Sequence, residues 1–327
     1  MSNPTEKAQN SLPLIKKEHR NKVLITLFVL TALAGGGYWA VIAVTSGSAP
    51  LVALALRLAY VAILYMPVPL YTLLISRYVL SVPVPFRALL SLRHITVKKY
   101  ALVAGLFLAW AALMVGSVVI LGWLWPDTFG HLATTNGHLV HNLEKLIGTS
   151  VDTSTMNMPP TPLAMLPLGI FGALIAGLTV NAIFAMAEEI MWRGYLAQAF
   201  AGRPFCKKYV TIGVLWGLWH IPLIALGYNY GTANALPGSV LFIGFCVVMS
   251  LVLGFVVERT RSVWLAAVLH GTFNGFSQVM LLLVVGGSSL LASSAVGVIS
   301  LVAWLVVFAG CYISYISTAC ASVTKRA

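Results

Sequence analysis

Long apolar runs recur along almost the whole chain and leave it few folds to choose from. We find about eight, at roughly 23–46, 51–76, 100–125, 165–190, 209–227, 238–257, 262–285 and 289–319. A run of about 20 apolar residues spans the hydrocarbon core of a bilayer as one α-helix. Only 9% of the residues are charged and 59% are hydrophobic, which does not suit a soluble domain of this size. We therefore predict an all-α polytopic membrane protein with about eight transmembrane helices.

Basic residues collect at alternate ends of these runs. If the N-terminus is cytoplasmic and each run crosses once, all but two of the 20 lysine and arginine residues fall on the cytoplasmic side. The exceptions are Arg57, within the second run, and Lys145, in the longest outer loop. Positively charged loops stay on the cytoplasmic side of membrane proteins, so both termini are predicted to be cytoplasmic. Arg57 could snorkel outward or pair within the bundle.

The net charge of +12 is explained by this orientation and by contact with anionic lipid head groups. We therefore expect the lipid bilayer, and no nucleic acid, as a partner. The first run is too long for a cleavable signal peptide, so it is predicted to be a span. Short polar tails and brief loops favour a cell membrane protein of a prokaryote, in the inner or plasma membrane.

The longest outer loop, at about 126–163, contains three histidines, His131, His138 and His141. His138 and His141 are three residues apart, so one face of a helix could present both to a metal. A solvated loop is the preferred interpretation. Pro67 and Pro69 lie within the second run and predict a kink or break in that helix.

Two adjacent carboxylates, Glu188 and Glu189, lie in the fourth run. A charged group inside a bilayer costs about 2.5–3.5 kcal/mol on insertion scales, so it needs a partner or a function. On a helix, Arg193 is four residues from Glu189 and can pair with it, whereas Glu188 is turned away by about 100°. One carboxylate can thus be neutralised while the other faces a different helix. We interpret the pair as functional.

Two histidines and an amide lie in later runs, at His220, His270 and Asn274. His270 and Asn274 are four residues apart and share a helix face. Glu188, His220 and His270 lie at about 15, 16 and 12 Å from the predicted cytoplasmic ends of their helices. A lone histidine in a membrane helix is as readily a structural hydrogen-bond partner, so the interpretation rests on the set. These residues are predicted to line one hydrated cavity.

The same residues form three ordered motifs, Glu188-Glu189-x-x-x-Arg193, Trp216-x-x-x-His220 and His270-x-x-x-Asn274. In this order, on neighbouring apolar segments, they resemble the CAAX protease and bacteriocin-processing family of intramembrane endopeptidases. The resemblance extends over about residues 165–285 and leaves the first 160 residues without a family signature.

The resemblance implies a peptide hydrolase, either glutamate-dependent or of the metallo type, acting on a membrane-bound protein or peptide. Prenylated CAAX proteins and bacteriocins are the substrate classes it suggests. Glu188 would activate water, His220 would orient or polarise that water, and His270 with Asn274 would stabilise the oxyanion. The second carboxylate and its arginine, Glu189 and Arg193, would hold the arrangement in place.

The chain then divides into four parts. These are a basic cytoplasmic tail (1–22), N-terminal transmembrane helices with the outer loop (23–160), a catalytic helical core (161–285), and a final transmembrane helix with a short cytoplasmic tail (286–327).

The cofactor expectation is none or a single zinc ion. Glu188, His220 and His270 would match the three-ligand pattern of catalytic zinc sites, but the sequence lacks the HExxH helix of common zinc proteases, which slightly favours a metal-free enzyme. Two other functions stay open as alternatives. One is a proton-coupled transporter, which also uses intramembrane carboxylates, although the sequence has no visible inverted repeat. The other is a non-catalytic membrane scaffold on the same fold.

Overall fold

The computed structural model describes residues 15–90, 95–154 and 156–324, with side chains as far as residue 314. Within these residues, seven helices are long and apolar enough to span a membrane, and a pair of helices bent by 56° adds an eighth. The prediction of an all-α polytopic membrane protein with about eight spans is therefore confirmed. The spanning helices are α2 (Lys17–Val44), α3 and α4 (Pro50–Tyr60 and Val68–Tyr78), α6 (Val97–Leu124), α9 and α10 (Met165–Leu178 and Val180–Glu189), α12 (Phe205–Ala225), α13 (Ala235–Thr260), α14 (Val263–Leu283) and α16 (Val298–Thr324).

Shorter elements connect or extend these helices. They are a π-helical turn Val61–Tyr65, α5 (Phe86–Leu89), α7 (Pro126–Phe129), β1 (His131–Leu132), α8 (Asn136–Ile147), a 3-10 turn Pro162–Ala164, a π-helical segment Ile190–Leu196, α11 (Ala197–Ala199), a 3-10 turn Thr232–Asn234, β2 (Val284–Val285) and α15 (Leu290–Ser293). The first span starts earlier than its apolar run, because α2 begins at Lys17, inside the predicted tail. Residues 1–14 of that tail lie outside the described residues.

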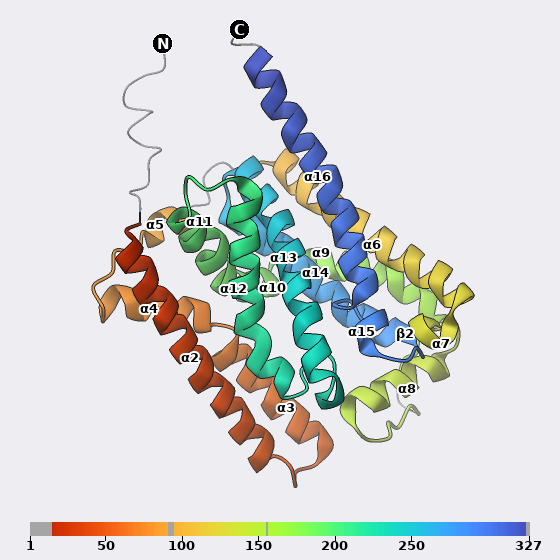
Figure 1. Cartoon of the computed structure of the whole chain (residues 1–327). Coiled ribbons are helices and arrows are strands. Elements are labelled where there is room, and N and C mark those ends of the chain that lie inside the picture. The colour runs from red at the N-terminus through yellow and green to blue at the C-terminus, as the bar shows by residue number, and fades with distance from the viewer. Residues whose placement is uncertain (1–14, 91–94, 155, 325–327) are drawn as a thin grey trace.

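Helix α2 begins and α16 ends at the same end of the bundle, the upper end in Figure 1. We call this end the terminal face and the opposite end the far face. An even number of crossings brings both ends of a chain to one side, so the bent pair α9–α10 counts as a single crossing. The assignment of the terminal face to the cytoplasm stays a prediction from the charge distribution.

The second span is broken where its prolines predicted. A π-helical turn, Val61–Tyr65, ends α3, and α4 begins at Val68 directly after Pro67. Proline removes a backbone donor and crowds the preceding turn, which explains the break. Arg57, on the far-face half of this span, donates from Nε to Thr45 Oγ1 over 3.0 Å. Arg57 therefore pairs within the bundle.

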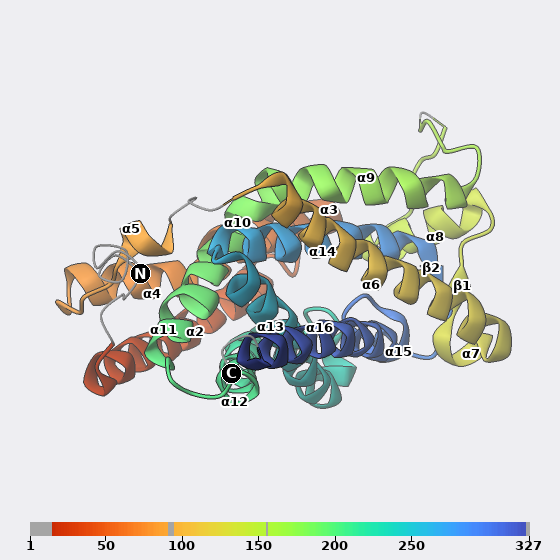
Figure 2. The ribbon, with the colours of Figure 1, turned by 90° about the horizontal axis from the view of Figure 1, so that it is seen from above.

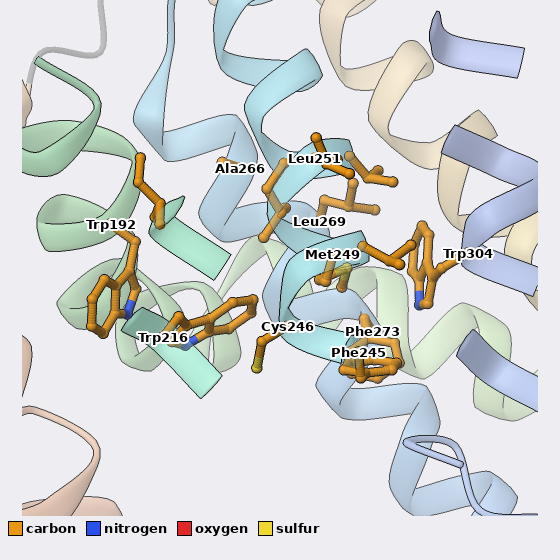
Figure 3. Close-up of a cluster of buried hydrophobic side chains, with 14 of the residues drawn as sticks. Trp192, Trp216, Phe245, Cys246, Met249, Leu251, Ala266, Leu269, Phe273 and Trp304 are labelled. Carbon is orange, nitrogen blue, oxygen red and sulfur yellow. The ribbon is translucent and has the colours of Figure 1, made fainter. Parts of the chain in front are cut away.

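Helix α14 lies at the centre of the bundle. Figure 2 shows it between the α9–α10 pair on one side and α13 and α16 on the other. Aromatic side chains of α6, α14 and α16 pack together on the side of α14 that faces α16. The rings of Trp110 and Trp304 stack at 5.2 Å, and Phe273 meets the Trp110 ring edge-on at 4.9 Å. Figure 3 shows this buried layer continuing from Trp304 through Phe273 towards Trp216.

The bend between α9 and α10 lies at Thr179, where the span presses against α14. Gly177 lies so close to Thr272 that a Cβ atom would collide with it, and a Cβ on Gly271 would lie 2.7 Å from the backbone carbonyl carbon of Asn181. The Asn181 amide donates to Gly271 O over 3.1 Å. Small residues thus let the two backbones approach closely, as is usual between membrane helices. The bend fixes the direction in which α10 continues past α14.

Candidate functional site

The two carboxylates end α10 and are both buried, with Glu188 4% exposed and Glu189 fully inaccessible. The helix continues as the π-helical segment Ile190–Leu196, all seven residues of which are buried. Such segments are rare and occur frequently at functional sites. Arg193, within this segment, donates from Nη1 to Glu189 Oε1 over 2.9 Å. This is the pairing that the spacing of four residues predicted.

Glu189 also connects α10 to α14. His270 Nδ1 lies 3.0 Å from the same Oε1 atom that accepts from Arg193. A carboxylate can only accept in this contact, so Nδ1 of His270 carries the hydrogen. The other ring nitrogen, Nε2, faces away from Glu189. The structure therefore joins His270 to Glu189, the carboxylate with the arginine, and not to Glu188.

Glu188 has a different partner. Its Oε2 accepts a hydrogen bond from Trp216 Nε1 over 2.8 Å. The indole of Trp216 also lies under the Arg193 guanidinium, with 4.3 Å between Cζ and the ring centroid. Its ring meets that of His270 edge-on at 5.3 Å. One tryptophan thus contacts both sides of the acidic pair, and no other described side chain donates a hydrogen bond to Glu188.

His220 joins the cluster through the same tryptophan. Its Nδ1 lies 2.9 Å from Trp216 O, one helical turn earlier. Because a carbonyl oxygen only accepts, Nδ1 is protonated, and Nε2 is the acceptor of the neutral ring. Trp219 and Phe242 flank the imidazole with ring centroids 4.4 and 4.6 Å from it. These contacts fix the plane of the ring.

The depth of these groups explains why Trp216 forms the bridge. Glu188 precedes the last residue of α11, Ala199, by eleven positions, and Trp216 follows the first residue of α12, Phe205, by eleven. At 1.5 Å per residue both lie about 16 Å from the terminal ends of their helices. His220 is one turn further from that face. Trp216 enters the motif only as its aromatic position, and the role of its N–H donor was not predicted, although its place four residues before His220 could have indicated it.

Asn274 is the one predicted site residue that lies apart from the cluster. It is exposed, and its side chain has no hydrogen-bond partner among the described residues. It lies one turn from His270 on the same helix, in the direction of the far face, at a Cβ distance of about 5–6 Å. The cluster therefore contains Glu188, Glu189, Arg193, His220 and His270, with Asn274 at its edge.

The described residues do not form a metal site. No three His, Cys, Asp or Glu side chains among them are arranged to hold an ion, and this includes the predicted set Glu188, His220 and His270. In both histidines Nδ1 is engaged, by Trp216 O and by Glu189, so only the Nε2 atoms are available as ligands. Metal-bound histidines are usually engaged at the other nitrogen in the same way, so the misfit of a three-ligand zinc ion lies only in the arrangement of the three side chains.

The outer-loop histidines lie at the far face, away from the cluster. The rings of His131 and His138 lie 5.6 Å apart, and His138 Nδ1 accepts from the backbone N–H of Thr134 over 3.3 Å. His141, which the spacing had paired with His138, lines a separate cavity instead.

Comparison with known proteins agrees with the motifs. Residues 159–276 match the model of the family described as type II CAAX prenyl endopeptidase Rce1-like. A segment of 95 residues is 28% identical to CAAX prenyl protease 2 of Methanococcus maripaludis and covers 28% of this chain. The match spans 35% of that relative's length, so the chain aligns with about a third of it. Together these matches support the CAAX protease family for the part of the chain that carries all three motifs.

Proposed function

We propose that this multi-pass membrane protein is an intramembrane endopeptidase that hydrolyses a peptide bond of a membrane-anchored substrate. The names of the matching family and of the relative suggest a prenylated protein ending in a CAAX sequence. The observation that carries the proposal is the buried cluster that joins an acidic pair to two histidines from two other spans. A cluster of that composition serves acid–base chemistry.

Glu188 is assigned the role of general base. Trp216 holds its Oε2, and its Oε1 makes no hydrogen bond with any described residue. A water molecule at Oε1 would give its proton to the carboxylate as its oxygen attacks the carbonyl carbon of the substrate. The same proton then passes from Glu188 to the leaving amine as the C–N bond breaks. The products are a carboxylic acid and an amine, and no other reactant is consumed.

The two histidines have separate roles in this scheme. His220 presents Nε2 as an acceptor and orients the attacking water. His270 would donate from Nε2 to the oxyanion, and to do so it must carry a proton on both nitrogens. The Glu189 carboxylate, 3.0 Å from Nδ1, is the counter-ion for that cation. Arg193 in turn fixes Glu189.

Asn274 is assigned the role of second hydrogen-bond donor to the oxyanion. It belongs to the same face of α14 as His270, and its exposure leaves its amide free to meet a substrate that approaches from outside the cluster. Preorganised donors of this kind are each worth about 2.7–4 kcal/mol in the transition state.

Replacing Glu188 with Gln tests the proposal. The full-length protein would be reconstituted in vesicles, and cleavage of a farnesylated CAAX peptide followed by mass spectrometry. We expect Glu188→Gln to abolish cleavage with the expression level and the thermal unfolding temperature retained. Glu18→Gln, at the exposed start of α2, is the matched control and should cleave normally. Full cleavage by Glu188→Gln would contradict the role of Glu188 as the base. A wild type that cleaves nothing would favour a scaffold, or a transporter if Glu188→Gln also abolishes coupled proton flux.

Metal dependence is tested separately. We expect the purified protein to hold less than one equivalent of zinc and to keep its activity after dialysis against a chelator. Metal content would be measured by plasma mass spectrometry on the wild type and on a His220→Ala, His270→Ala double variant. One zinc per chain, lost in the double variant, would assign the site to the metallo type.

A further inference from the structure

The far face contains a cavity of about 260 Å³ with no part in the proposed cleavage. Its walls come from α8, from the end of α14 with the following Gly286–Gly287 turn, and from α15. Apolar contacts and two hydrogen bonds hold α8 in place. Leu139 of α8 packs with Ala133 and Leu283 in a small apolar cluster of its own, and Asn142 Nδ2 donates to the carbonyls of Leu282 and Val284 at 2.8 and 2.9 Å. The cavity is thus bounded by fixed elements.

One wall of the cavity is cationic and polar. His141 and Lys145 lie one turn apart on α8 and both line it. No described carboxylate lies within ion-pair distance of Lys145. Its neighbour Glu144 accepts from the backbone N–H of Val151 instead. The cavity therefore carries a positive charge that the described chain does not neutralise.

The rest of the lining combines apolar side chains with an unpaired hydroxyl. Leu281 of α14 and Leu290 of α15 supply the apolar surface. Ser294 Oγ is buried without a hydrogen-bond partner among the described residues. A buried hydroxyl of this kind is unfavourable until it finds a partner. An occupant with an anionic oxygen and an apolar extension would complement both parts of the lining.

The cavity lies at the level of the lipid head groups. Helix α14 has 21 residues and is about 31 Å long at 1.5 Å per residue, close to the roughly 30 Å thickness of the hydrocarbon core. Because the cavity borders the last turn of α14, it opens where a phospholipid places its phosphate. An acyl chain attached to that phosphate would reach the apolar side chains.

We propose that this cavity binds the phosphate group of an anionic phospholipid from the far-face leaflet. Lys145 and His141 meet the phosphate, Ser294 donates to one of its oxygens, and the first carbons of an acyl chain lie against Leu281 and Leu290. The proposal does not depend on peptidase activity. The apolar side chains favour a lipid over free phosphate, which could use only the polar side chains of the cavity.

Native mass spectrometry of the full-length protein would test this site. The protein would be purified with an equimolar mixture of phosphatidylglycerol and phosphatidylcholine that have the same acyl chains. We expect the wild type to retain phosphatidylglycerol preferentially and Lys145→Gln to lower that retention about fivefold. Lys207→Gln is the matched control, because Lys207 is exposed near the start of α12 on the terminal face. Lys145→Glu, a change at an exposed position that should not impair folding, should lower retention further.

Two results would overturn the proposal. One is equal retention of phosphatidylglycerol by Lys145→Gln and Lys207→Gln. The other comes from thermal unfolding with added ligand, in which inorganic phosphate alone stabilises the wild type as much as phosphatidylglycerol does. That result would assign the cavity to a free anion. Phosphatidylglycerol stabilising the wild type but not Lys145→Gln, with phosphate without effect, is the expected outcome.

Discussion

Replacing Trp216 with Phe isolates the hydrogen bond that holds Glu188. Phe keeps an aromatic ring beneath Arg193 and beside His270, but it removes the N–H that donates to Glu188 Oε2 over 2.8 Å. A hydrogen bond to a charged group is worth about 1.5–3 kcal/mol. If the bond positions the base in the transition state, its loss lowers the turnover rate by about 10- to 100-fold, since 1.36 kcal/mol corresponds to a factor of ten.

Trp304→Phe makes the same chemical change at a matched position. Trp304 is also buried, but its Nε1 has no hydrogen-bond partner among the described residues. Its ring stacks on Trp110, far along the buried layer from Trp216 (Figure 3). The two variants therefore share the loss of volume and differ in the hydrogen bond. We expect Trp304→Phe to keep a turnover close to that of the wild type.

The assay is steady-state cleavage of a prenylated peptide by the reconstituted protein. We expect the loss in Trp216→Phe to appear in kcat with KM little changed, because the bond orients a reacting group and does not bind substrate. A second measurement is independent of activity. In protein labelled with 15N at its indoles, Glu188→Gln should move the resonance of Trp216 and leave that of Trp304 in place. Turnover of Trp216→Phe within twofold of Trp304→Phe, or an unmoved Trp216 resonance, would refute the reasoning.

Three other substitutions test the surroundings of the cluster. Arg193→Met leaves the buried Glu189 carboxylate with His270 as its one remaining described partner and should lower the free energy of unfolding by about 3–5 kcal/mol. Adding Glu189→Gln should recover part of this loss in denaturant titrations. A double variant as unstable as the single would count against the ion pair. Gly271→Ala forces the backbones of α10 and α14 apart and should lower the free energy of unfolding by about 1–3 kcal/mol. Gly172 has open space around it, so Gly172→Ala should leave that free energy unchanged. Equal stability of the two variants would contradict the close packing. Asn274→Ala should change stability by less than about 0.5 kcal/mol but lower kcat by about 10²- to 10³-fold, and unchanged turnover would remove Asn274 from the mechanism.

The number of spans could be predicted from the apolar runs alone. A helix in hydrocarbon makes all its backbone hydrogen bonds internally, so its length is visible as the length of the apolar run. The bend at Thr179 could not be predicted from the length of the run. Residues 165–190 form one continuous apolar run interrupted by few polar residues, and the bend depends on how closely Gly177 and Gly271 let two backbones approach. Such contacts involve residues about 90 positions apart, which a local pattern does not connect.

The candidate site was predicted unevenly for a similar reason. The pair Glu189–Arg193 depends only on the geometry of one helix, and the spacing predicted it. The partner of His270 depends on how α14 is rotated against α10, so the sequence could not distinguish Glu188 from Glu189. The spacing of four residues puts His270 and Asn274 on one face of α14, but whether each turn of that face is covered depends on neighbouring helices. His270 is buried and Asn274 is exposed.

The two carboxylates differ in environment although they are adjacent in sequence. A rotation of about 100° between them gives Glu189 a guanidinium and an imidazole, both at about hydrogen-bond distance, while Glu188 receives one neutral indole N–H. In a medium of low dielectric constant, a carboxylate paired with a cation stays charged and fixed. One without such a partner can take up and release a proton at lower cost. Arg193 can neutralise only one of the pair, and because it pairs with Glu189, Glu188 is the carboxylate that we propose for the chemistry.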